Sequence, residues 1–159
     1  MLRRATDGEI PAVAALIAAN PMALLQQPEA WLREIAGGEA RGVLIWDEGG
    51  IEGFAVIDWE YPGVIGLWNL GVVQPRRGVG QRLIRAVLDE VFGRLGAHRL
   101  FCDAAFDNAA AIAAFGKAGF VREGVMRECW QREPGVWVDC VAFSMLAREW
   151  RADAWQARA

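Results

Sequence analysis

The chain is short of the residues and runs that mark several common classes of protein. Its 159 residues include three cysteines, Cys102, Cys129 and Cys140, which share no CxxC or CxxH spacing. Such spacings would indicate a zinc site or a redox pair, and a denser pattern would indicate a disulfide framework. We therefore expect three small buried thiols, no metal site and a reducing, cytoplasmic environment.

Long apolar runs are missing as well. No stretch reaches the roughly 18 apolar residues that a membrane-spanning helix needs. The N-terminal segment Met1–Asp7 lacks the apolar region of a signal peptide. The sequence therefore predicts a cytoplasmic protein with no membrane partner.

Positive charge is not in excess, because the formal net charge is −3. A domain that binds nucleic acid usually has a basic face, so we expect no nucleic-acid partner. Against this acidic background, Arg76, Arg77, Arg82 and Arg85 lie close together in the sequence. This local cluster indicates a site for one anion rather than a general polyanion surface.

The chain does have a hydrophobic fraction of 54%, which is enough for the core of one domain. No repeat, low-complexity segment or shift in composition marks an internal boundary, so we expect a single domain over residues 1–159. The tail, 147–159, is polar apart from Trp150 and Trp155, and is either a short helix or partly loose. Periodicity and turn residues predict helices at 7–19, 28–36, 79–95 and 108–118, and strands at 1–5, 42–46, 51–59, 64–73, 98–104, 120–130 and 136–146.

The order of these elements predicts the fold class. Strand 64–73, helix 79–95 and strand 98–104 form a right-handed crossover, which pairs its two strands in parallel. The wide apolar face of helix 79–95 indicates that it packs on a sheet. The other strands follow one another through short turns and are expected to be antiparallel. We predict an α/β fold with a mixed, mostly antiparallel central sheet, one parallel pair and flanking helices.

Three features keep two interpretations open. The apolar loop 22–27 either lines a substrate entrance or packs on the core. Trp31, Trp59 and Trp68 suit an aromatic substrate wall, although core packing is expected for most of the eight tryptophans. His98, the single histidine, could act as a base, but its position at the start of a strand favours a structural role.

The turn after strand 64–73 carries the clearest chemical signal. Gly78 and Gly80 would let a ligand approach the backbone closely, and the first amides of the following helix have no intrahelical partners. Neighbouring guanidinium groups would add charge-assisted bonds, a combination that suits a pyrophosphate. The arginines concerned are Arg76, Arg77 and Arg82.

Two familiar phosphate sites do not match this turn. A Rossmann site needs three glycines in an N-terminal βαβ unit, whereas Leu83 stands at the third position and the turn follows an antiparallel meander. A P-loop needs Gly-Lys-Ser/Thr, which is absent from the turn. Both alternatives are therefore disfavoured.

In this setting the turn resembles the acetyl-CoA loop of the GNAT N-acetyltransferase superfamily, Arg/Gln-x-x-Gly-x-Gly/Ala. Later segments look like the branch of that superfamily that acetylates the N-termini of ribosomal proteins. The resemblance covers residues 68–150 well, and the first half of the chain matches in its pattern of elements. The motifs that carry it are Arg76–Gly80, 95–100, Asn108, 117–128, 137–139 and 143–150.

The resemblance implies a GNAT-like fold whose parallel strands splay apart, with a CoA-binding core at about residues 64–130. The backbone near Val72 and Val73 would hold the pantetheine arm of acetyl-CoA. Asn108 would bond the pantetheine or thioester region, and Phe115 and Lys117 would flank the CoA tail. The residues expected to hold the pyrophosphate are Arg76, Arg77, Gly78, Val79, Gly80, Gln81 and Arg82.

Acetyl transfer to an amine also implies a base that removes the amine proton. We expect this base to be Glu60 or Asp58, on the strand and turn that would face the cleft; the alternative is that both are solvated hairpin carboxylates. Superfamily members often have a Tyr where this chain has Phe115, and the ribosomal branch often has a Ser where this chain has Ala111. Neither Phe115 nor Ala111 can protonate a leaving thiolate. A CoA thiol is nevertheless acidic enough for its thiolate to leave without help.

The resemblance thus implies an acetyl-CoA-dependent N-acetyltransferase that acts on a primary amine by direct attack. The acceptor is either a protein N-terminus or a small amine, and the sequence does not decide between them. A rival hypothesis is a non-catalytic acyl-CoA-binding or sensor protein of the same fold, which the residues at positions 111 and 115 favour. The oligomeric state also stays open, with a homodimer as one option.

Overall fold

The structure is a computed structural model that describes residues 1–75 and 77–150. Arg76 and residues 151–159, with Trp155, lie outside the described residues. The helices are η1 (Asp7–Glu9), α1 (Ile10–Ala18), α2 (Glu29–Ala36), α3 (Val79–Leu88), η2 (Asp89–Arg94) and α4 (Ala109–Lys117). The strands are β1 (Leu2–Arg4), β2 (Gly42–Asp47), β3 (Ile51–Tyr61), β4 (Val64–Val72), β5 (Arg99–Ala105), β6 (Val121–Glu133) and β7 (Val136–Leu146).

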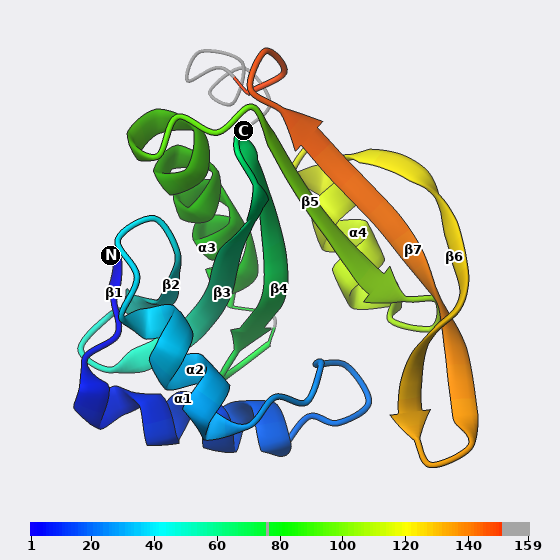
Figure 1. Cartoon of the computed structure of the whole chain (residues 1–159), viewed down its shortest axis with the longest axis horizontal. Coiled ribbons are helices and arrows are strands. Elements are labelled where there is room, and N and C mark those ends of the chain that lie inside the picture. Colours follow the sequence, from blue (N-terminus) through cyan, green and yellow to red (C-terminus); the bar gives the residue numbers. More distant parts are fainter. Residues whose placement is uncertain (76, 151–159) are drawn as a thin grey trace.

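All of these strands belong to one seven-stranded sheet in the order β1-β2-β3-β4-β5-β7-β6 (Figure 1). Neighbouring strands are antiparallel except for β4 and β5, which are parallel. The parallel pairing joins only Val64–Gly66 to Arg99–Phe101, and beyond it the two strands diverge. The predicted fold class is therefore confirmed, and the splayed parallel pair that the resemblance implied is present.

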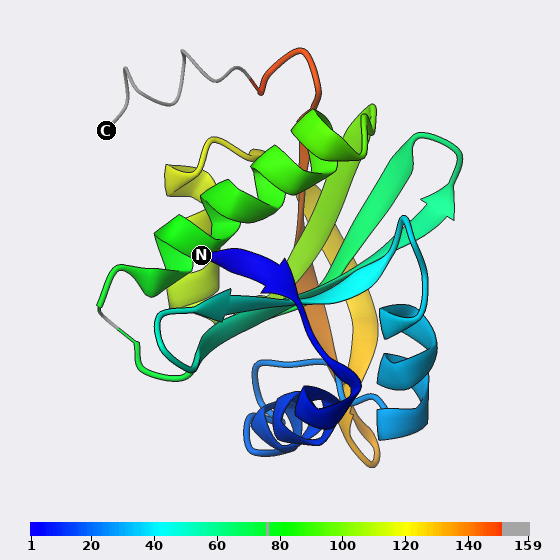
Figure 2. The same ribbon diagram turned by 90° about the vertical axis from the view of Figure 1, so that its left-hand side faces the viewer.

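The helices cover both faces of the sheet (Figure 2). The first face packs against α1 and α2, whose apolar residues recur at helical spacing. The second packs against α3, η2 and α4. Buried residues on the first face include Val13, Ile17, Leu32, Ile45 and Phe54. Buried residues on the second face include Ile65, Leu83, Val87, Leu100 and Phe143.

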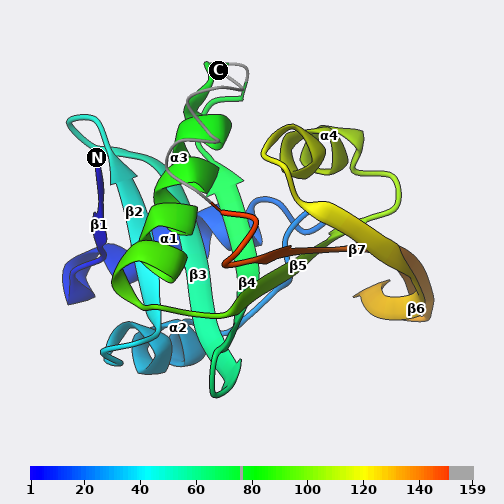
Figure 3. The same ribbon diagram turned by 90° about the horizontal axis from the view of Figure 1, so that it is seen from above.

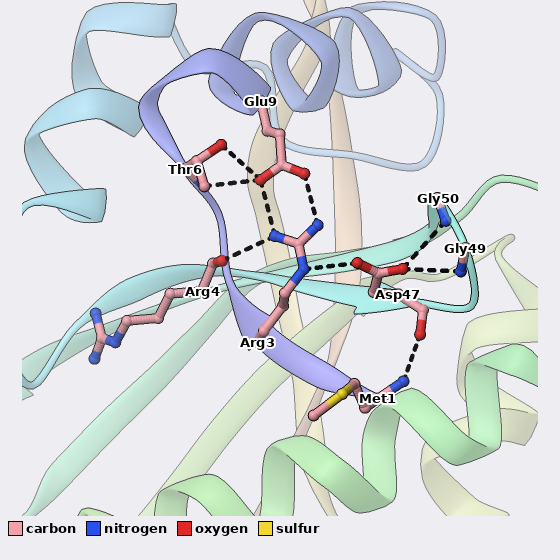
Figure 4. A network of polar contacts seen from close by, with 8 residues as sticks. All are labelled: Met1, Arg3, Arg4, Thr6, Glu9, Asp47, Gly49 and Gly50. Carbon is pink, nitrogen blue, oxygen red and sulfur yellow. Dashed lines mark hydrogen bonds and ion pairs between the residues drawn. The ribbon is translucent and has the colours of Figure 1, made fainter.

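A network of charged side chains holds the short strand β1 at the edge of the sheet (Figure 4). The guanidinium of Arg3 donates to Asp47 Oδ2 at 2.7 Å and to both carboxylate oxygens of Glu9 at 2.9 and 2.7 Å. Glu9 also accepts from the backbone and hydroxyl of Thr6, and Asp47 accepts from the amides of Gly49 and Gly50. Arg3 and then Thr6 lower the pKa of Glu9 to about 2.

The helix predicted at 79–95 is not one regular α-helix. Its second part, Asp89–Arg94, is π-helical, and Leu95 N–H bonds to Glu90 O, five residues earlier. Trp150 packs against Phe92 with ring centroids 5.9 Å apart. A Cβ at Gly93 would lie 3.3 Å from the Trp150 ring, so the missing side chain makes room for it. The π-helical segment therefore lies where Trp150 packs against the helix, a contact that helical periodicity in the sequence does not predict.

One extra residue also interrupts the pairing of β4 with β3. Val56 pairs with Asn69 and Ile57 with Leu67, so Trp68 is an additional residue on β4. Such a bulge changes the direction of the following side chains and is common beside functional sites. Here it lies just past the last parallel pair, Gly66 with Phe101, where β4 and β5 separate.

Candidate active site

A cavity of about 820 Å³ lies where β4 and β5 diverge. Its walls come from the second half of β4, from β5, from the start of α4, from the loop between α1 and α2, and from β6. Figure 1 shows that loop extending beneath the lower end of β4, toward the β6–β7 hairpin. In the view from above, α4, β6 and β7 lie on the side of the sheet away from β1 (Figure 3). Segments far apart in the sequence therefore meet around one hollow.

The divergence leaves one edge of β4 free. In the described sheet, β4 pairs with β5 only as far as Gly66, while its other edge pairs with β3 as far as Val72. Val73 lies just beyond, and its N–H donates to Glu52 O at 2.9 Å. Val72 and Val73 both line the cavity. An extended ligand with amide groups can therefore pair with the free edge of β4 as an added strand would.

The glycine turn ends at the start of α3. Gly78 is the N-cap, with φ +73°, a conformation that favours glycine, and no side chain of the described residues caps the helix. The N–H groups of its first turn are therefore available to an anion. A Cβ added to Gly80 would meet only the Val72 side chain, at 3.9 Å, so the space above this backbone is open.

The other residues expected at the pyrophosphate have several different environments. Arg77 donates to Gln74 at 3.1 Å, and Arg82 donates to Glu48 at 3.0 Å and to Arg77 O at 3.3 Å; both arginines are exposed. Gln81 Nε2 donates to Ala114 O at 2.9 Å and so ties α3 to α4. Val79 is buried, and it can contribute only its backbone.

Helix α4 begins at the cavity. Asn108 is its N-cap and lines the cavity, and its side-chain oxygen accepts from Ala111 N at 3.1 Å. Ala111 and Phe115 also line the cavity, and neither carries a hydroxyl group. Phe115 packs against two other aromatic rings with centroids 5.3 and 5.7 Å away. Lys117, at the end of α4, is exposed and lies outside the lining.

Among the described residues, three charged side chains line the cavity: Arg99, Asp103 and Glu123. Arg99 donates to both oxygens of Glu123 at 2.7 Å, and Ser144 donates to the same carboxylate at 2.7 Å. Arg99 and then Ser144 lower the pKa of Glu123 to about 2, so this group is a paired anion.

Asp103 has no such cation. Burial against the surrounding protein raises the pKa of its carboxyl, although the group is open to the cavity, and a hydrogen bond from Cys140 partly opposes the rise. A carboxylate with a raised pKa on a cavity wall is suited to accept a proton from a bound ligand.

The candidates chosen from the sequence, Asp58 and Glu60, lie elsewhere. Asp58 accepts from Trp59 N at 2.8 Å and lies 3.6 Å from an Arg41 nitrogen, and Glu60 is exposed. Neither lines the cavity. The signal that could have identified Asp103 is strand alternation, because Leu100, Cys102 and Ala104 face the core, while Arg99, Phe101 and Asp103 share the other face.

A comparison with protein-family models supplies the deciding observation. The model of the acetyltransferase (GNAT) family matches residues 11–120, which is more than half of the chain. The chain belongs to the GNAT acetyltransferase family. No curated protein matched the chain.

Solved structures described as acetyltransferases share the fold. A ribosomal-protein-S18-alanine N-acetyltransferase from Escherichia coli aligns with a TM-score of 0.75 and 20% identity, over 92% of this chain and 93% of its own. A ribosomal-protein-alanine N-acetyltransferase from Brucella melitensis aligns with a TM-score of 0.77 and 23% identity, over 92% of this chain and 99% of its own. A protein from Salmonella typhimurium aligns with a TM-score of 0.75 and 20% identity, over 96% of each chain. It is described as an acetyltransferase and was solved with its cofactor acetyl-CoA.

In this GNAT protein, the cavity and the start of α3 together have features that suit acetyl-CoA. The α3 residues from Val79 to Arg82 are not part of the cavity lining; they adjoin it at Val72, whose side chain would lie 3.9 Å from a Cβ at Gly80. The uncapped start of α3 and the open space at Gly80 suit a pyrophosphate, and the free edge of β4 suits the amides of a pantetheine arm. Among the described residues no cluster of three or more His, Cys, Asp and Glu side chains could hold a metal ion. No helix of the described chain is long and apolar enough to span a membrane.

Proposed function

We propose that this protein transfers the acetyl group of acetyl-CoA to a primary amine, with Asp103 as the base. The observation that carries the proposal is the position of Asp103, which lies on β5 where β4 and β5 diverge and lines the same cavity as Val72, Asn108 and Phe115. One wall of this cavity suits an acyl-CoA, and another holds a carboxylate that can receive a proton.

The amine must lose a proton before it attacks, and in this proposal Asp103 accepts that proton. An alkylamine with a pKa of about 8 to 10 is mostly protonated at neutral pH and must lose a proton before its nitrogen can attack. The unpaired carboxylate first attracts the ammonium group and then accepts the proton, directly or through one water. Burial raises the pKa of Asp103 and so makes it a better base than an ordinary Asp.

The backbone of β4 and the side chains of α4 serve the other half of the reaction. Attack by the nitrogen on the thioester carbonyl places negative charge on its oxygen, which N–H groups on the free edge of β4 can stabilise. The carbon–sulfur bond then breaks, and the thiolate leaves with the electron pair. The nitrogen gives up its second proton, which passes through water to the thiolate. Phe115 and Ala111 offer no proton, and a thiol of pKa about 8.5 leaves readily without one.

One assay tests this function. The purified protein is mixed with acetyl-CoA and a panel of primary amines and N-terminal peptides, and thiol release is measured. We expect turnover with at least one acceptor and formation of its acetylated product by mass spectrometry. If CoA does not raise the thermal midpoint of the protein and no acceptor is turned over, the proposal is wrong.

The second hypothesis, a non-catalytic acyl-CoA sensor, is favoured by one observation, the lack of a hydroxyl group on the α4 residues that line the cavity. It predicts CoA binding without turnover across the whole panel. Thermal protection by acetyl-CoA and no release of thiol would therefore support the sensor and exclude the enzyme.

A further inference from the structure

The part of the cavity away from α4 has largely apolar walls. Trp68 on the β4 bulge and Phe101 on β5 meet edge to face, with ring centroids 6.0 Å apart and planes at 84°. The loop between α1 and α2 and the strand β6 complete this wall. The further apolar residues there are Leu24, Leu25, Phe54, Met126 and Trp130. Such surroundings bind an apolar body, and aromatic edges and faces favour a ring.

Of the charged side chains that line the described cavity, one pair neutralises itself and one carboxylate remains. Arg99 and Glu123 neutralise each other through two bonds of 2.7 Å, so neither is free to bind a ligand of opposite charge. Asp103 is the one carboxylate of the described lining that has no cationic partner. One positive charge can therefore be matched in this part of the cavity. A polyamine or an arginine-rich peptide would have to place further charges beside Arg99 or apolar side chains.

Asn69 supplies a polar group close to the aromatic wall. Its side chain is 3% exposed and lines the cavity, and its amide nitrogen donates to Leu25 O at 3.1 Å. Its side-chain oxygen is buried and has no hydrogen-bond partner in the described structure. Buried acceptors of this kind are rare because they cost free energy, so an N–H group of a ligand is a fitting partner.

We propose that the acceptor is a small primary amine that carries a single positive charge on an apolar, ring-sized body. The charge would lie at Asp103, the ring would pack against the contacting pair Trp68 and Phe101, and an N–H group would lie near Asn69. This proposal rests on the proposed function and narrows its substrate class.

The test compares 2-phenylethylamine, ethylamine, spermidine and a hexapeptide with a free N-terminus and three arginines. Specificity is measured as kcat/KM for thiol release from acetyl-CoA. We expect 2-phenylethylamine to exceed each of the other three by about tenfold or more, a ratio that one well-packed ring can supply. A kcat/KM for spermidine or the peptide equal to or above that of 2-phenylethylamine would overturn the proposal and leave the proposed function intact.

A pair of variants tests whether the preference for 2-phenylethylamine depends on Trp68. Trp68→Ala should raise KM for 2-phenylethylamine about tenfold and leave KM for ethylamine within about twofold, because only the larger amine uses the ring. The matched control is Trp137→Ala, since Trp137 is 53% exposed and lies outside the lining. Equal effects of Trp68→Ala on both amines would contradict the proposed aromatic wall.

Binding separates this proposal from the proposed function. If no amine is turned over, calorimetry with the CoA-saturated protein compares 2-phenylethylamine with spermidine. Tighter binding of 2-phenylethylamine would support the proposed amine class although catalysis had failed. Weaker or equal binding would overturn it.

Discussion

At the scale of single residues, the proposed chemistry depends on the groups that surround Asp103. Glu123, which lines the same cavity, is held as an anion by Arg99 and Ser144, whereas Asp103 has a thiol, Cys140, as its hydrogen-bond donor. The two carboxylates share one cavity, and their pKa values move in opposite directions. One therefore stays ionised throughout the neutral range, and the other is poised to take up a proton.

The Asp103–Cys140 contact predicts a shift in pH dependence. Because the hydrogen bond from Cys140 lowers the pKa of Asp103, Cys140→Ala should raise that pKa further. Activity falls when the base is protonated, so the acidic limb of the kcat/KM profile should move to higher pH. Cys140→Ser keeps a donor and should leave the limb near its original position. An unchanged profile in Cys140→Ala would show that the thiol does not influence the base.

At the scale of elements, the site depends on two strands that separate and on a helix that begins there. The uncapped N-terminus of α3 follows from Gly78, the N-cap residue, which has a positive φ and no side chain that could cap the helix. Gln81 then ties the start of α3 to Ala114 in the second half of α4, so α3 is held against α4. A displaced α3 would therefore carry the proposed pyrophosphate site away from Asn108.

Gly80 offers a direct test of that helix start. A Cβ there would lie 3.9 Å from the nearest atom, in the Val72 side chain, so we expect Gly80→Leu to fold with a nearly unchanged thermal midpoint. The added group would fill the space above the first-turn amides and should raise KM for acetyl-CoA by about tenfold. Gly8→Leu, at an equally open position on η1, is the control. An unaltered KM in Gly80→Leu would remove this turn from the binding site.

The β6–β7 hairpin is fixed to the start of α4 by one charged pair. Arg132 donates to both oxygens of Asp107 at 2.9 and 2.7 Å, and its guanidinium lies 5.1 Å from the centre of the Trp130 ring. The Arg132 side chain is only 5% exposed. The same guanidinium thus contacts both Asp107, which precedes α4, and Trp130, which lines the cavity.

At the scale of the whole molecule, the sheet brings together residues that no single segment contains. Its edge strand β1 is only three residues long, and the Arg3–Glu9–Asp47 network fixes it to the turn after β2. The stability of this edge should depend on pH. The pKa of Glu9 falls from 4.5 to about 2 on folding, so its contribution is complete above pH 4.5 and disappears as the pH falls toward 2.

Glu9→Gln removes the carboxyl group whose protonation would make the stability of this edge depend on pH. The variant should be less stable than the original protein at pH 7, and the difference should shrink as the pH is lowered from 4.5 to 2. Urea unfolding at several pH values measures it, with the exposed Glu39→Gln as the control. A difference between Glu9→Gln and the original protein that does not change with pH would contradict the role given to the network.

Much of this arrangement could be predicted from the sequence, because local patterns determine it. Period-two and helical spacing located the strands and helices, and the crossover from β4 through α3 to β5 identified the parallel pair. Asn108 was expected to begin a helix, and it is the N-cap of α4. Asp103, the proposed base, was not predicted, because the environment that raises its pKa comes from burial in the fold and includes Cys140 on β7, which is far away in the sequence. The bulge at Trp68 depends in the same way on pairing between strands.

The most direct test of the account is the rate of thiol release from acetyl-CoA in Asp103→Asn, compared with Asp58→Asn and Glu60→Gln. We predict that Asp103→Asn lowers kcat about 10²- to 10⁴-fold with acetyl-CoA affinity unchanged, and that the other two variants stay close to the original rate. A full rate in Asp103→Asn, or a comparable loss in Glu60→Gln alone, would contradict the assignment of the base.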